Sequence, residues 1–69
     1  MNINEILLDS AKAGYLEKVK LLIANGADLN AKNDDGWTPL NLASRYRYLE
    51  VAKFIETHIK SQEKPKVKK

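Results

Sequence analysis

The chain has 69 residues, which is enough for one small domain that buries only about 60% of its unfolded surface. Its 43% hydrophobic and 30% charged residues fit a packed helical protein. With no cysteine and one histidine, we expect no disulfide, metal or cofactor. No apolar run reaches the roughly 20 residues of a membrane span. Residues 1–5 lack the features of a secretory signal, so we expect a cytoplasmic protein without membrane association.

The net charge of +3 is concentrated at one end of the chain. Residues 60–69 contain five lysines and one glutamate, a net of +4, which leaves −1 on residues 1–59. Because this segment has few apolar side chains to offset the entropy of ordering, we interpret it as a basic disordered tail. Its lysines fit solubility, weak attraction to nucleic acid or acidic partners, or a nuclear-import-like signal. No aromatic residue lies among them, which argues against base stacking on single-stranded nucleic acid.

The first third of the chain predicts two helices. Apolar residues recur at steps of three and four, which is the spacing of one helical face, over about residues 4–13 and 15–25. Asn2 and Glu5 have the spacing of a capping box at the start of the first helix, and Gly14 separates the two helices. A connection this short makes the two helices antiparallel.

A turn-rich stretch follows and ends in a second helix pair. Gly26 comes just after the second helix, where the backbone often turns left-handed and glycine has no Cβ penalty. Residues 34–36, Asp-Asp-Gly, are a turn signal. Thr38 can then cap a new helix that has Pro39 at its first position. This third helix is expected over residues 38–45, and a longer fourth helix should end near residue 59.

The two helix pairs are related by an internal repeat. A shift of 33 residues superimposes Leu7 on Leu40, Tyr15 on Tyr48, Leu16 on Leu49, Glu17 on Glu50, and Lys20 on Lys53. A period of 33 residues with one helix pair per unit is typical of ankyrin repeats. In addition, residues 25–31 read NGADLNA and residues 35–40 read DGWTPL. These two motifs, in register, resemble the junction between two ankyrin repeats, and the resemblance covers about residues 3–59.

The resemblance implies an all-α fold, a short ankyrin-like solenoid in which two antiparallel helix pairs are joined by a hairpin-like loop. The domain would occupy residues 1–59, with repeats at 3–32 and 33–59. Ankyrin domains mostly bind proteins, so the resemblance implies a non-enzymatic module without a small-molecule substrate. It would bind a partner protein through the concave face formed by the loop tip and the first helices. The alternative is nucleic-acid or acidic-partner binding through the lysine-rich tail.

Several positions depart from the family pattern. Arg47 stands where a glycine usually turns between the helices, which predicts strain or a shifted turn. Asn41 replaces the histidine of the TPLH motif. Glu56 replaces an apolar residue that would face a following repeat, and Ile59 replaces a helix-stop glycine, which predicts that the array ends here. With only two pairs, the apolar end faces either turn inward in a monomer or stack in an isologous homodimer.

Candidate partner-binding residues stand at the family's contact positions: Lys12, Ala13, Asp34, Asp35, Trp37, Arg45 and Tyr46. Tryptophan, tyrosine and arginine are enriched in interface hot spots, and Trp37 occupies a position that is exposed in the family. Two simpler interpretations remain open. Trp37 could pack over the helix pair, and Arg45 could lie along a solvated face.

The remaining polar residues predict no catalytic site. Asp34 and Asp35 are adjacent in a turn, and such pairs without a second cluster of titratable residues are nearly always turn formers. Asp28 is expected to bond loop backbone. His58 is expected to be exposed near a helix C-terminus, where it is favourable to the helix dipole.

Overall fold

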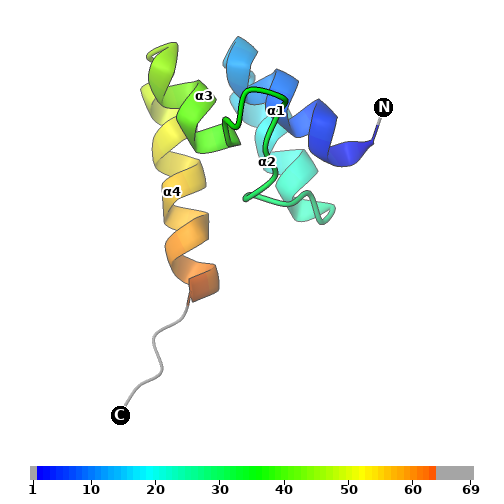
Figure 1. The fold of residues 1–69 in the computed structure, drawn as a ribbon. Helices are drawn as coiled ribbons and strands as arrows, with labels where there is room; N and C mark the ends of the chain where they lie inside the picture. The colour runs from blue at the N-terminus through cyan, green and yellow to red at the C-terminus, as the bar shows by residue number, and fades with distance from the viewer. Residues whose placement is uncertain (1, 64–69) are drawn as a thin grey trace.

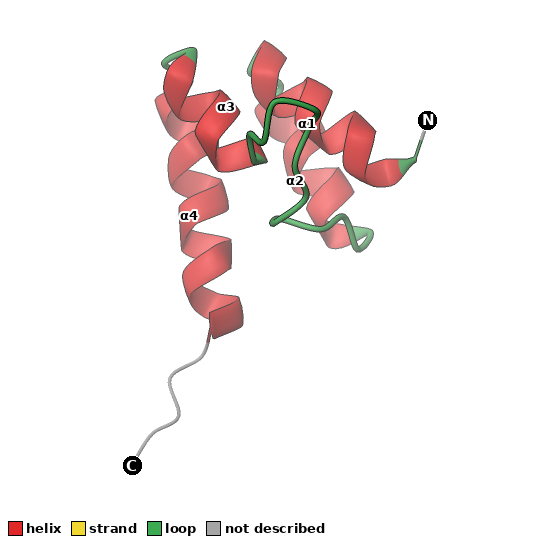
Figure 2. Cartoon of the chain, viewed as in Figure 1, coloured by secondary structure: helices red, strands yellow, loops and turns green. Residues whose placement is uncertain are grey.

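The computed structural model describes residues 2–63 (Figure 1). These residues form four helices and no strand (Figure 2): α1 (Ile3–Ala13), α2 (Leu16–Ala24), α3 (Pro39–Arg45) and α4 (Leu49–Glu63). The predicted all-α fold with two helix pairs is therefore confirmed.

The two helix pairs lie side by side. Within the pairs, α1 packs on α2 and α3 packs on α4, and between them α1 packs along α3 (Figure 1). The contact between α2 and α4 is less extensive. Between the pairs, the loop of residues 25–38 crosses over the molecule from the end of α2 to the start of α3. One end of α1, one end of α3 and the loop tip are thereby brought together.

The local start and stop signals form as the sequence predicts. The backbone N–H of Glu5 donates to Asn2 Oδ1 at 2.8 Å and caps α1, which is one of the two hydrogen bonds of a capping box. Thr38 and Asn41 form a capping box at the start of α3, because each side chain accepts from the other's backbone N–H, at 3.1 and 3.0 Å. Asn41, which stands in place of the family's histidine, therefore completes this cap. Gly26 has a positive φ of 95°, as expected for a helix stop.

The turns inside the two pairs are equivalent, and the second is strained. Arg47 has a φ of 65°, whereas Gly14, 33 residues earlier, has a φ of 80°. The same backbone hydrogen bond closes both turns, from Tyr15 N to Ser10 O at 3.0 Å and from Tyr48 N to Ala43 O at 2.9 Å. A left-handed residue other than glycine costs about 1–3 kcal/mol. The predicted strain at Arg47 is therefore present, and the turn is not shifted.

The core lies between the pairs and under the loop. All four helices and the loop contribute buried apolar side chains: Leu7, Leu8, Ala11, Val19, Ala27, Leu29, Leu42, Ala43, Val51 and Ile55. Leu29, at 1% exposure, shows that the loop is part of this core. Leu7, Val51 and Ile55 turn inward, whereas Ile3, Ile6 and Phe54 are half-buried, so the monomer and the homodimer both remain predictions.

The end of α4 corrects one prediction. We expected the helix to end near residue 59 and a disordered tail to begin at residue 60, but α4 continues to Glu63. Neither glycine nor proline occurs between Leu49 and Pro65, and lysine, glutamine and glutamate are good helix formers. Lys60 also pairs with Glu56, one turn earlier, at 3.9 Å. The rest of the predicted tail, residues 64–69, lies outside the described residues.

The prediction for His58 was also wrong. Because α4 continues beyond it, His58 is not at the helix C-terminus, and it is half-buried. Its ring lies 4.4 Å from the ring of Phe54, measured between centroids, and its Nδ1 is 3.4 Å from the Phe54 carbonyl oxygen. His58 is therefore a packing residue of α4.

Candidate partner-binding face

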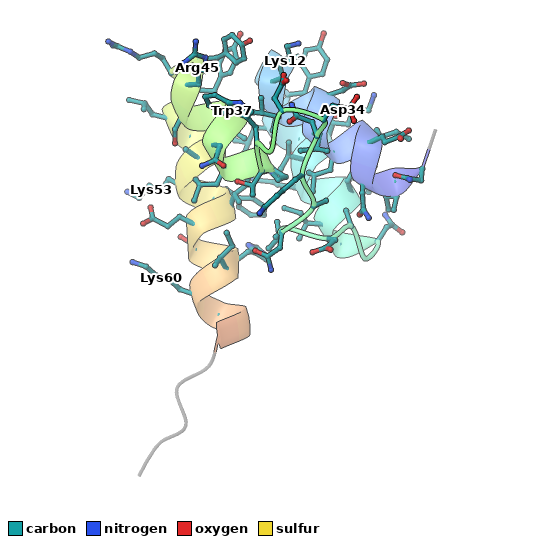
Figure 3. All side chains as sticks on the ribbon, in the orientation of Figure 1. Lys12, Asp34, Trp37, Arg45, Lys53 and Lys60 are labelled. Carbon is teal, nitrogen blue, oxygen red and sulfur yellow. The ribbon has the colours of Figure 1, made fainter. Side chains whose placement is uncertain are left out.

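A shallow depression of about 230 Å³ lies where the end of α1, the loop tip and the end of α3 meet. It is lined by Lys12, Asn33, Asp35, Trp37, Leu42, Arg45 and Tyr46. Five of the seven predicted contact residues are therefore brought together. Figure 3 shows Lys12, Trp37 and Arg45 at this end of the molecule, whereas Lys53 and Lys60 lie further along α4.

The loop tip beside Trp37 is held by Asn33. The side-chain Oδ1 of Asn33 accepts hydrogen bonds from the backbone N–H groups of Asp35 and Trp37, both at 2.9 Å. The backbone N–H of Asn33 donates to the Trp37 carbonyl oxygen at 3.0 Å, and Gly36 N–H donates to Asn33 O at 2.9 Å. Asn33 was not among the predicted site residues, although asparagine at the start of a turn is a signal for such bonds. It fixes the backbone that carries Trp37.

Trp37 is less exposed than its position in the family implies. It is half-buried and packs against the hydrophobic core, so the packing interpretation holds for part of the ring. The rest of the ring contributes to the depression. The guanidinium carbon of Arg45 lies 5.0 Å from the centre of the indole, which is a cation–π contact. The guanidinium group of Arg45 is therefore held against Trp37, although Arg45 as a whole is exposed.

The charges around the depression are mostly positive. Lys12 reaches it from the last turn of α1 and Arg45 from the last turn of α3, while Asp35 is the acidic residue among its lining residues. Among the described side chains, those of residues 2–61, the ion pairs are Lys20–Glu17 and Lys60–Glu56. No carboxylate of the described side chains therefore lies within 4.0 Å of the Lys12 or Arg45 charge.

Two predicted contact residues lie elsewhere. Asp34 lines a separate hollow over α1 that includes Glu5 and Asp9, because successive residues of the turn point in different directions. Ala13 lines a third hollow that includes Ile6. One residue further along a helix is rotated by about 100°, so Ala13 faces away from the depression that Lys12 enters. The structure therefore does not support grouping them with the other five residues.

Asp28 and Asn4 stabilise the loop through hydrogen bonds to its backbone. Asp28 Oδ1 accepts from the backbone N–H of Asn30 at 2.8 Å, as predicted for a loop former. Asn4 Oδ1 accepts from Asp28 N–H at 2.7 Å and ties the loop to α1.

In the part of the chain that the structure describes, no three histidine or carboxylate side chains gather into a metal-binding group. None of the described helices is long and apolar enough to cross a membrane.

Comparisons with known proteins agree with this architecture. The family model described as "Ankyrin repeats (many copies)" matches residues 7–55. The chain is 39% identical over 49 residues to protein phosphatase 1 regulatory subunit 27 of Mus musculus, which covers 71% of this chain and 32% of the relative. It is 44% identical over 46 residues to protein phosphatase 1 regulatory subunit 12A of Mus musculus, with 67% of this chain and 4% of the relative covered.

A third relative is the Notch-regulated ankyrin repeat-containing protein of Xenopus tropicalis, which is 38% identical over 47 residues, covering 68% of this chain and 41% of the relative. The matched region thus spans less than half the length of each of these three relatives. The family match covers most of the chain, and the 33-residue period, the motifs and the helix pairs of the chain agree with that match. The chain belongs to the ankyrin repeat family.

Proposed function

We propose that this chain is a non-catalytic module that binds a partner protein through the depression between the loop tip and the ends of α1 and α3. Ankyrin repeats generally mediate protein–protein interaction. One observation carries the proposal for the face: Lys12 from the first repeat and Asp35, Trp37, Arg45 and Tyr46 from the second line the same depression. The depression therefore exists only when the two repeats pack together, as they do in the folded chain.

The composition of the depression supports this function. Binding energy in protein interfaces concentrates in a few tryptophan, tyrosine and arginine residues, and all three types occur here. The half-buried indole is already supported by the core and by the Asn33 hydrogen bonds, so little ordering is needed on binding. Two of the relatives are named as regulatory subunits of a protein phosphatase, and proteins of that kind act on another protein.

The competing mode, nucleic-acid binding through the lysine-rich C-terminal segment, predicts a different response. Deleting residues 64–69 would abolish it, and its affinity would fall steeply with salt. Binding at the depression should survive the same deletion. The deletion begins at residue 64 because α4 continues to Glu63.

Trp37→Ala is expected to weaken partner binding by about 2 kcal/mol, or roughly 30-fold, because it removes the aromatic centre of the depression. The partner would be captured from the source cells with the full chain, identified, and titrated calorimetrically. Tyr15→Ala is the matched control, since Tyr15 is 59% exposed and lies outside the depression. Circular dichroism of both variants checks the fold. If Trp37→Ala leaves the affinity within about 0.5 kcal/mol of the wild type, the proposed face is wrong.

A further inference from the structure

We infer that the partner segment presents a side-chain carboxylate, from aspartate or glutamate, to Arg45 and Lys12. This inference rests on the proposed function and specifies the chemistry of the partner. The occupant is an extended segment of another protein with an acidic residue at the centre of its contact with the depression. Three features of the depression support it: the fixed Arg45, the second cation from the other repeat, and the position of Asp35.

Arg45 is prepared for a carboxylate by its contact with Trp37. A guanidinium group is planar and carries five N–H donors along its edge, which match the two oxygens of a carboxylate. The indole lies 5.0 Å from the guanidinium carbon, so it holds the position of the group through a cation–π contact. No carboxylate of the described side chains pairs with Arg45, so the donors remain available. Because the side chain is already held, less rotamer entropy is lost when a ligand binds.

Lys12 adds a second positive charge to the same depression. It comes from α1 and therefore from the other repeat, and it has no ion-pair partner among the described side chains. Residues 1–59 as a whole carry a net charge of −1, so this positive depression differs from the rest of the domain. Opposite charge across an interface favours association and selects the register of the partner.

Asp35 limits where the acidic residue can bind. Its backbone N–H is held by Asn33, so Asp35 lines the depression from the loop tip. A second acidic residue on the partner would be repelled there, whereas a neutral or basic residue would be accepted. The partner segment is therefore expected to carry its acid toward Arg45 and Lys12, with no acid opposite Asp35.

The test starts from a display library of random 12-residue peptides, which are selected for binding to the full 69-residue chain. Only peptides whose binding depends on Trp37 are kept. The selected peptides are expected to share one aspartate or glutamate at a fixed position. Changing that acid to its amide should weaken binding to the wild-type chain by about tenfold or more, since hydrogen bonds to charged groups contribute about 1.5–3 kcal/mol. Fluorescence titration of the paired synthetic peptides measures the affinity of the acidic peptide divided by that of its amide, which we call the acid-to-amide ratio.

Three variants of the chain assign the effect. Arg45→Lys keeps the charge but removes the planar donors and should reduce the acid-to-amide ratio to about threefold or less. Asp35→Asn removes the repulsive charge and should strengthen binding of the acidic peptide by about two- to fivefold. Lys53→Gln is the control, because Lys53 is exposed on α4 outside the depression and should leave the ratio unchanged.

The outcomes separate this inference from the function on which it rests. Selected peptides without a shared acid, or an acid-to-amide ratio that Arg45→Lys leaves unchanged, would overturn the inference while the binding face stands. If no peptide shows binding that depends on Trp37, the proposed binding face fails, and the inference fails with it.

Discussion

Leu7→Ala is expected to lower the free energy of unfolding by about 3 kcal/mol, within the range of about 2–5 kcal/mol for buried leucines. Leu7 is fully buried in α1, and α1 packs against both α2 and α3. The substitution therefore leaves a cavity at the junction of the two repeats. A domain of this length has a total stability of roughly 3–10 kcal/mol, so the variant should be close to unfolding. Urea denaturation monitored by circular dichroism measures the change.

The matched control is Leu21→Ala, which makes the same chemical change on α2 at a side chain that is 62% exposed. Its stability should stay within about 0.5 kcal/mol of the wild type. Equal losses in the two variants would mean that the core does not lie between the helix pairs.

Gly14→Ala is expected to destabilise the chain by about 3 kcal/mol, because two effects add. A left-handed backbone costs a residue with a Cβ about 1–2 kcal/mol, and Gly14 has a φ of 80°. A Cβ at this position would also lie 2.6 Å from the Cδ1 and Cε1 atoms of Tyr48, which overpacks the contact between the two turns by about 1–3 kcal/mol. Thermal and urea unfolding report the loss.

Gly36→Ala separates the two effects. Gly36 has nearly the same φ, 82°, but no atom lies within 4 Å of a Cβ built there. Only the backbone cost of about 1–2 kcal/mol should remain. In a Tyr48→Ala background, the cost of Gly14→Ala should fall toward that of Gly36→Ala. If the two glycines cost the same in the wild-type background, Tyr48 does not restrict the turn at Gly14.

The turns could be predicted from sequence because their chemistry is local. The left-handed Gly26, the cap made by Thr38 with Pro39 beside it, and the helix start at Asn2 each depend on residues within a few positions. The family pattern then added a further prediction, since it has a glycine where this chain has Arg47 and so indicated strain in the second turn. These features fixed the order and pairing of the four helices.

The details that the sequence did not predict depend on side-chain contacts and directions that a motif or a composition does not show. The end of α4 at Glu63 depends on the Glu56–Lys60 pair and on the absence of a nearby breaker, which outweighed the composition of the tail. Trp37 is half-buried because the core and Arg45 cover it, and neither contact is visible in the DGWTPL motif. Family contact positions likewise did not separate Asp34 from Asp35, since direction within a turn decides which side chain enters the depression.

The most direct test of the proposed binding face is a chemical-shift map of the ¹⁵N-labelled chain titrated with the captured partner or a selected peptide. The largest changes should occur at residues 33–37, at the ends of α1 and α3, and at the Trp37 indole N–H, because these groups surround the depression. Changes along α2 should be small. If the largest changes instead fall on the surface between α2 and α4, around Lys20 and Phe54, the partner binds the opposite layer and the proposed face is wrong.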